Sequence, residues 1–243
     1  MAEPNDPSKI LVIVAHPDDI DFGAAGSVAT WTAAGIDVVY CLVTSGDAGG
    51  DDRSESHEDR SAAREAEQIA AAHEVGVSEL IFMRRPDGRL EYNLALRRDL
   101  SRVIRQVRPD RVVTQSQHVN LDRIYASHPD HLAVGAAALA AVYPDARNPF
   151  AHTELLDDEG LEPWSVPEVW IMGPQDSSVR GLESVDITDV FDKKVRALRA
   201  HVSQTAKMDN LEEMLRDWGQ QSAEFAGLEA GRIAELFRRV ETQ

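Results

Sequence analysis

Apolar and polar positions alternate along the chain in blocks that predict strands and helices in turn. Residues 10–15, Ile-Leu-Val-Ile-Val-Ala, are apolar without a break and rich in β-branched side chains. Such a run is typical of a strand that is buried on both faces of a parallel sheet. Small residues over 23–34 predict a helix that ends at Gly35, and 38–44 predicts a second buried strand. The chain therefore opens with a βαβ unit.

The alternation continues through the middle of the chain. Helical spacing over 61–75 and 94–107 predicts two helices, and 79–83 and 111–114 predict the strand that follows each of them. The expected fold class is α/β, with a Rossmann-like, mostly parallel sheet and helices on both faces. Ligands bind outside the carboxyl ends of the strands in open sheets of this kind. The loops after the strands are therefore where we expect the chemistry.

The last part of the chain predicts further elements around an irregular segment. We expect helices over 132–142, 188–201 and 211–240, and strands over 169–172 and 185–187. Residues 143–167 are Pro-rich and are expected to cover the site or to contact another copy in a homo-oligomer. Residues 1–243 are expected to form one domain, with a core over about 9–204 and a helical tail over about 205–243.

Charge and composition narrow the expected partners. The formal net charge of −17 disfavours nucleic acid and anionic lipid surfaces, so a neutral or cationic small molecule is the expected partner. The single cysteine, Cys41, excludes an intramolecular disulfide and a zinc cluster built from thiolates. No leader pattern and no run of about eighteen apolar residues occurs. We expect a cytoplasmic protein without membrane insertion.

The tripeptide His-Pro-Asp occurs twice, as HPDD at 16–19 and as HPDH at 128–131. Each copy follows a predicted strand, so a parallel sheet can bring both to the same edge. Catalytic zinc takes three ligands from histidine and carboxylate and leaves a position for water. An additional carboxylate can then act as general base, and an additional imidazole as acid or oxyanion stabiliser. The candidates for these five roles are His16, Asp18, Asp19, His128 and His131.

Helix capping is the alternative explanation of each copy alone. The sequence His-Pro-Asp is also typical of the beginning of a helix, with the histidine before the helix and the proline at its first position. Two copies with a metal-binding fourth residue, each after a strand, favour the metal site instead. Asp130 is left with the role of a helix-start carboxylate. Of the other histidines, we expect His57, His73 and His152 to lie on the surface or in helices. We assign no place to His118 and His201.

The chain resembles the LmbE-like or PIG-L family of zinc-dependent N-deacetylases. The resemblance rests on Ala15-His-Pro-Asp-Asp19 after a buried strand and on Ser127-His-Pro-Asp-His131, and it extends from Ile10 to about Gln204. It includes the further segments 44–50, 64–67, 76–77, 86–88, 108–110 and 201–204. Family members deacetylate N-acetylglucosamine derivatives. The resemblance implies the same reaction here, with an amino-sugar substrate and the release of acetate and a free amine.

The resemblance also implies a role for each polar residue of the two motifs. His16, Asp19 and His131 would bind one zinc ion per chain, although these ligand types also suit iron(II) or another first-row divalent ion. Asp18 would be the general base, and His128 would stabilise the oxyanion.

Three further residues match less distinctive positions of the family. Arg53 and Asp87 match positions that contact the sugar, and Tyr125 matches an additional oxyanion donor. The chain departs from many relatives in having Ile20 and then Asp21 where they have glutamate directly after the two aspartates. This departure bears mainly on specificity.

Three alternative functions stay open to different degrees. One is an amidase that cleaves a larger glucosaminyl-inositol thiol conjugate, and another is a non-catalytic metal-binding relative. Retention of all five polar residues of the motifs argues against the second. A nucleotide-binding enzyme is disfavoured because no Gly-x-Gly-x-x-Gly pattern follows the first strand.

Overall fold

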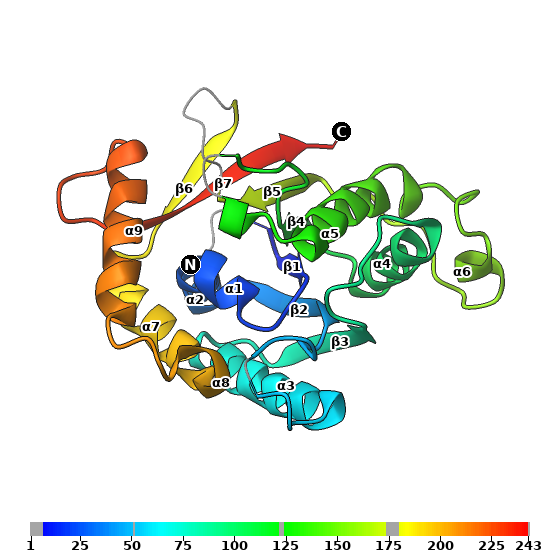
Figure 1. The fold of residues 1–243 in the computed structure, drawn as a ribbon. Coiled ribbons are helices and arrows are strands. Elements are labelled where there is room, and N and C mark those ends of the chain that lie inside the picture. Colours follow the sequence, from blue (N-terminus) through cyan, green and yellow to red (C-terminus); the bar gives the residue numbers. More distant parts are fainter. Residues whose placement is uncertain (1–6, 51, 122–123, 174–179, 243) are drawn as a thin grey trace.

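The computed structural model describes residues 7–50, 52–121, 124–173 and 180–242. Within them the chain forms one α/β domain around a seven-stranded sheet (Figure 1). The strands are β1 (Lys9–Val14), β2 (Asp37–Thr44), β3 (Glu79–Arg85), β4 (Arg111–Thr114), β5 (Glu168–Met172), β6 (Leu182–Asp186) and β7 (Ala234–Glu241). The helices are α1 (Asp19–Gly23), α2 (Ala25–Ala33), α3 (His57–Glu74), α4 (Leu94–Val107), α5 (Pro129–Ala140), α6 (Glu154–Asp157), α7 (Phe191–Ala200), α8 (Val202–Thr205) and α9 (Leu211–Phe225).

The sheet has the order β3-β2-β1-β4-β5-β7-β6. The first five strands in this order are parallel, and β7 pairs antiparallel with β5 and β6. This confirms the expected mostly parallel sheet. The chain leaves β1 for β2 on one side, and β4 adds to the other side of β1. The carboxyl ends of β1 and β4 therefore flank the point where the strand order reverses, which is where ligands bind in such sheets.

The unbroken apolar run of β1 is explained by burial on both faces. Ile10, Val12 and Val14 pack into a core with α2, α3 and α7, whereas Leu11 and Ile13 pack into a second core with α4 and α5. All five side chains are fully buried. Helices cover both faces of the sheet, as Figure 1 shows, so the strand alternates between two apolar layers instead of between core and solvent.

The helix predicted over 23–34 is found as α2, and a short helix that was not predicted precedes it. This short helix, α1, begins at Asp19, and α2 begins after a break at Ala24, whose φ is −147°. The prediction missed α1 because its start depends on the backbone of Asp18, which has a φ of 83°. No apolar periodicity signals such a conformation.

The prediction of a wholly helical tail was wrong. Helix α9 ends at Phe225, and Gly227 and Gly231 then adopt φ values of 75° and 88°, which end helical continuation. The chain returns as β7, which satisfies its backbone by pairing between β5 and β6. Among the described residues, no helix has the length and apolar character needed to span a membrane.

Candidate active site

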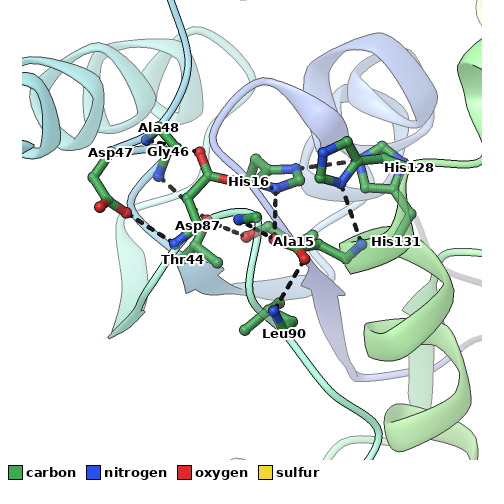
Figure 2. Close-up of polar contacts among 12 residues, drawn as sticks. Ala15, His16, Thr44, Gly46, Asp47, Ala48, Asp87, Leu90, His128 and His131 are labelled. Carbon is green, nitrogen blue, oxygen red and sulfur yellow. Dashed lines mark hydrogen bonds and ion pairs between the residues drawn. The ribbon is translucent and has the colours of Figure 1, made fainter.

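The exits of β1 and β4 are tied together directly. The backbone N–H of Ala15 donates to Gln115 Oε1 at 3.0 Å, and the Thr44 hydroxyl donates to the Ala15 carbonyl at 2.9 Å. His16 follows Ala15 and is only 8% exposed. His128 and His131 reach the same place from the start of α5. Figure 2 shows the three histidines together, with Asp87 on the other side of His16.

Three side chains present donor atoms to one point. His16 Nδ1 lies 3.2 Å from His131 Nε2 and 3.3 Å from the Asp19 carboxylate. His131 Nε2 lies 3.0 Å from the same carboxylate. Ligand atoms of a tetrahedral zinc ion are about 3.3 to 3.6 Å apart when the metal–ligand distances are about 2.0 to 2.2 Å. The spacing and the chemistry of this donor set therefore fit a first-row divalent ion.

The second nitrogen of His16 faces two carboxylates. His16 Nε2 lies 3.0 Å from Asp87 Oδ1 and 3.2 Å from Asp130 Oδ2. The Asp130 carboxylate also accepts the backbone N–H groups of Gly88 at 2.7 Å and Leu90 at 3.1 Å. Metal-binding histidines usually have such a carboxylate partner, which fixes the ring and its tautomer. Asp130 is thus more than the helix-start carboxylate that the sequence suggested.

The electrostatics of the cluster favour positive charge. Burial lowers the pKa of His16, but Asp130, Asp19 and Asp87 together raise it to about 12. Burial raises the pKa of Asp19, but His131 and His16 hold it well below its usual range. The carboxylates of the cluster therefore stabilise positive charge at this point, as they would stabilise a bound cation.

Asp18 lies beside the cluster and differs from Asp19 in its surroundings. Burial raises the pKa of the Asp18 carboxyl to about 6, and the charge of Arg64 acts in the opposite direction. Arg64 Nη2 donates to Asp18 Oδ2 at 3.0 Å and to the Pro17 carbonyl at 2.7 Å. A buried carboxyl with a pKa this near neutrality is suited to general base catalysis.

His128 is arranged as a hydrogen-bond donor. Its Nδ1 accepts the Asp130 backbone N–H at 3.2 Å as the N-cap of α5. Burial and the positive charge of His16 lower the pKa of His128, so the ring is neutral. Because Nδ1 accepts, we assign the proton to Nε2. The ring centroid lies 4.9 Å from that of His16.

Other predicted residues lie at different distances from this cluster. Asp87 is part of it, and its second carboxylate oxygen accepts the Ala48 N–H at 3.1 Å. Arg53 is exposed in the turn before α3, and Tyr125 is 88% exposed in the 3₁₀ turn Ile124–Ala126. No hydrogen bond or ion pair among the described residues joins either of them to His16.

Two residues of α3 belong to the site but were given no role from the sequence. Arg64 and Gln68 are buried, and Gln68 Oε1 accepts the Asp18 backbone N–H at 2.9 Å. Both lie on the helix face that carries Ala71, Ala72 and Val75 into the core. Polar residues on an apolar helical stripe are the signal that could have revealed them.

Of the two histidines that the sequence left open, His118 is exposed, whereas His201 is not. It is fully buried after α7, where His201 Nε2 lies 2.8 Å from Asp21 Oδ2. Burial lowers the pKa of His201, but the contact with Asp21 outweighs this effect and raises it. Of the histidines expected on the surface or in helices, His57 and His73 are exposed, whereas His152 lies outside a helix, is only partly exposed and contacts the buried Asp145.

Fold and site together define an α/β protein with a cluster of histidines and aspartates at the point where the strand order reverses. The family model described as PIG-L: GlcNAc-PI de-N-acetylase matches residues 11–142, which is more than half of the chain. The chain belongs to this family, as the two His-Pro-Asp motifs suggested.

Individual relatives agree with this assignment. A diacetylchitobiose deacetylase of Thermococcus kodakarensis is 33% identical over 200 residues, which cover 82% of this chain and 71% of that protein. A probable N-acetyl-alpha-D-glucosaminyl L-malate deacetylase 2 of Bacillus subtilis is 30% identical, with 86% and 89% covered. Among solved structures, N,N'-diacetylchitobiose deacetylase from Pyrococcus horikoshii superposes with a TM-score of 0.85 at 29% identity, with 97% and 85% covered.

Proposed function

We propose that this protein is a metal-dependent hydrolase that removes the N-acetyl group from an N-acetylglucosamine-type substrate. The products are acetate and a free amine. The observation that carries the proposal is the convergence of His16, Asp19 and His131, with donor atoms 3.0 to 3.3 Å apart, next to Asp18 and His128. Family membership and the deacetylase relatives support the same reaction.

The proposed metal is one zinc ion per chain. His16, Asp19 and His131 would hold it, and another first-row divalent ion would fit the same donors. A divalent ion bound there polarises the amide carbonyl and lowers the pKa of water.

The chain itself would supply the proton transfers and the charge stabilisation. Asp18 accepts the proton of the attacking water, since its buried carboxylate has a pKa near neutrality. Arg64, which donates to Asp18 Oδ2 at 3.0 Å, orients that carboxylate. His128, neutral and protonated at Nε2, donates to the oxygen that becomes negative as the tetrahedral intermediate forms.

The sugar would bind at the rim of the site. Asp87, Arg53 and Tyr125 remain the proposed contacts. Both oxygens of Asp87 already have partners in His16 and Ala48. Arg53 and Tyr125 are exposed and therefore accessible to the hydroxyl groups of a sugar.

An acetate-release assay tests the proposal. The zinc-loaded protein is offered N-acetylglucosamine, N,N'-diacetylchitobiose, and N-acetylglucosaminyl malate and inositol conjugates. Acetate is expected from at least one of them, with release at least about 10²-fold slower from the Asp18→Asn variant, whereas the exposed Asp209→Asn control should match wild type. Absence of acetate with all four substrates would contradict the proposed reaction.

A further inference from the structure

A chain of buried polar side chains leads from His201 to the backbone of Asp18. His201 Nε2 and Gln68 Nε2 each lie 2.8 Å from the same oxygen, Asp21 Oδ2. Gln68 Oε1 then accepts the Asp18 backbone N–H at 2.9 Å. The side chains of His201, Asp21 and Gln68 come from three different segments, and all three residues are fully buried.

The amide at the end of this chain belongs to a residue in a conformation that side chains disfavour. Asp18 has a φ of 83°, in the left-handed region. Two side chains of α3 help to hold the backbone there: Gln68 accepts the Asp18 N–H, and Arg64 donates to the Pro17 carbonyl at 2.7 Å. Residues in such conformations persist when their surroundings determine them from several sides.

This conformation separates the two neighbouring carboxylates. Asp19 Oδ2 accepts the backbone N–H of His16 at 2.7 Å and lies among the proposed metal ligands. Asp18 Oδ2 instead lies 3.0 Å from Arg64 Nη2. A regular helical backbone at Asp18 would redirect its carboxylate, so the left-handed turn is what gives the two acids different positions.

Asp21 determines which way Gln68 faces. An ionised carboxylate only accepts hydrogen bonds, so Gln68 must turn its NH₂ group toward Asp21 and its oxygen toward the Asp18 N–H. The N–H of His201 holds the same carboxylate from the other side. A fully buried carboxylate and imidazole carry a desolvation cost that apolar residues of similar volume would avoid. This cost favours a role beyond packing.

We propose that His201, Asp21 and Gln68 are positioning residues that orient the Asp18 carboxylate for proton transfer. The inference rests on the proposed function, in which Asp18 is the base. None of the three touches the donor atoms of the metal site directly. Their loss should therefore lower kcat while KM and the bound metal stay unchanged.

Paired substitutions test the series of hydrogen bonds from Asp21 through Gln68 to Asp18. Gln68→Glu places two carboxylates against each other, and Asp21→Asn removes the group that orients Gln68. Each is expected to lower kcat by about 10- to 100-fold, with one zinc per chain retained. The double variant with Gln68→Glu and Asp21→Asn exchanges the amide and the carboxylate and keeps the net charge. Its kcat is therefore expected to be at least about tenfold higher than that of the worse single variant.

A matched control comes from a second buried carboxylate. Glu235 accepts the N–H groups of Gly26 and Ser27 at the start of α2 and pairs with Lys194. Glu235→Gln should lower stability without changing kcat. It therefore separates a general effect of disturbing a buried network from an effect on Asp18.

Hydrogen exchange of the Asp18 amide, measured by NMR on the metal-free protein, gives a readout independent of activity. In Gln68→Met this amide should exchange about three- to tenfold faster, as expected for the loss of one hydrogen bond. Unchanged exchange, a kcat within about twofold of wild type in the single variants, or a double variant no better than the worse single variant would each overturn the inference. Failure of wild type to release acetate would instead contradict the proposed function, while the exchange measurement would still test the hydrogen bond.

Discussion

The two His-Pro-Asp copies have the same three residues but different local structures. In the second copy His128 caps α5, and Pro129 and Asp130 are its first helical residues. In the first copy the chain turns through the left-handed backbone of Asp18, and α1 begins one residue later. Equivalent positions therefore face different partners.

The consequence is opposite behaviour of equivalent side chains. His16 is buried and offers Nδ1 to the metal site, whereas the Nδ1 of His128 is occupied by a backbone N–H. Burial raises the pKa of Asp18 to about 6. Burial also raises the pKa of Asp130, but His16 and two backbone N–H groups outweigh this effect and hold the pKa of Asp130 below its usual range. Backbone geometry after the proline, and not the motif itself, therefore gives the two aspartates different surroundings, and the proposed base is in the first copy.

Asp18 and Asp130 are the equivalent aspartates of the two copies, and Asp18→Asn should have the larger effect on kcat. It removes the proposed base and keeps the shape of the side chain, so kcat should fall by about 10²- to 10⁴-fold while zinc is retained. Acetate release and metal analysis of the same preparation measure both. Activity near the wild-type level would assign the base elsewhere.

Asp130→Asn should have a smaller and different effect. The amide keeps one acceptor for the N–H groups of Gly88 and Leu90 but loses the charge that orients His16. Metal affinity, measured by competition with a chelator, should weaken by about 10- to 100-fold. An effect on kcat alone, with affinity unchanged, would mean that Asp130 acts as the base and that the two copies have exchanged roles.

The smallest expected effect is seen in the pH dependence of kcat/KM. Asp18 must be ionised to accept a proton, so kcat/KM should fall as the pH decreases through the pKa of this carboxyl. That pKa is about 6 without metal, and a nearby cation lowers it, so the limb in the zinc-loaded enzyme should lie at or below about pH 6. Rates measured across this range locate the limb. The limb should be missing from the residual activity of Asp18→Asn, and a limb well above pH 6 would contradict the assignment.

Much of the fold and the convergence of the two motifs could be predicted from sequence. The apolar run 10–15 predicted a central strand, and the positions of the two motifs after strands predicted their convergence. These predictions depend on local patterns and on general rules for parallel sheets. The strand β7 was missed because residues 234–241 are ordered by pairing with β5 and β6, which lie far away in sequence.

The supporting residues of the site could not be predicted in this way. Asp130 contacts His16 only because the loop after β3 supplies the N–H groups of Gly88 and Leu90. The sequence shows Ile20 and then Asp21 where many relatives carry glutamate directly after the two aspartates. Asp21 forms a buried contact with His201, 180 residues away, which no local pattern indicates.

The metal content of a matched pair of variants tests the central claim, that the second copy divides its two histidines between metal binding and oxyanion stabilisation. His128→Ala and His131→Ala are purified in parallel with the exposed His73→Ala control, and zinc per chain is measured. We predict about one zinc ion in His128→Ala and in the control, and almost none in His131→Ala. Loss of zinc from both His128→Ala and His131→Ala would indicate a three-histidine site, and retention in both would show that the metal lies elsewhere.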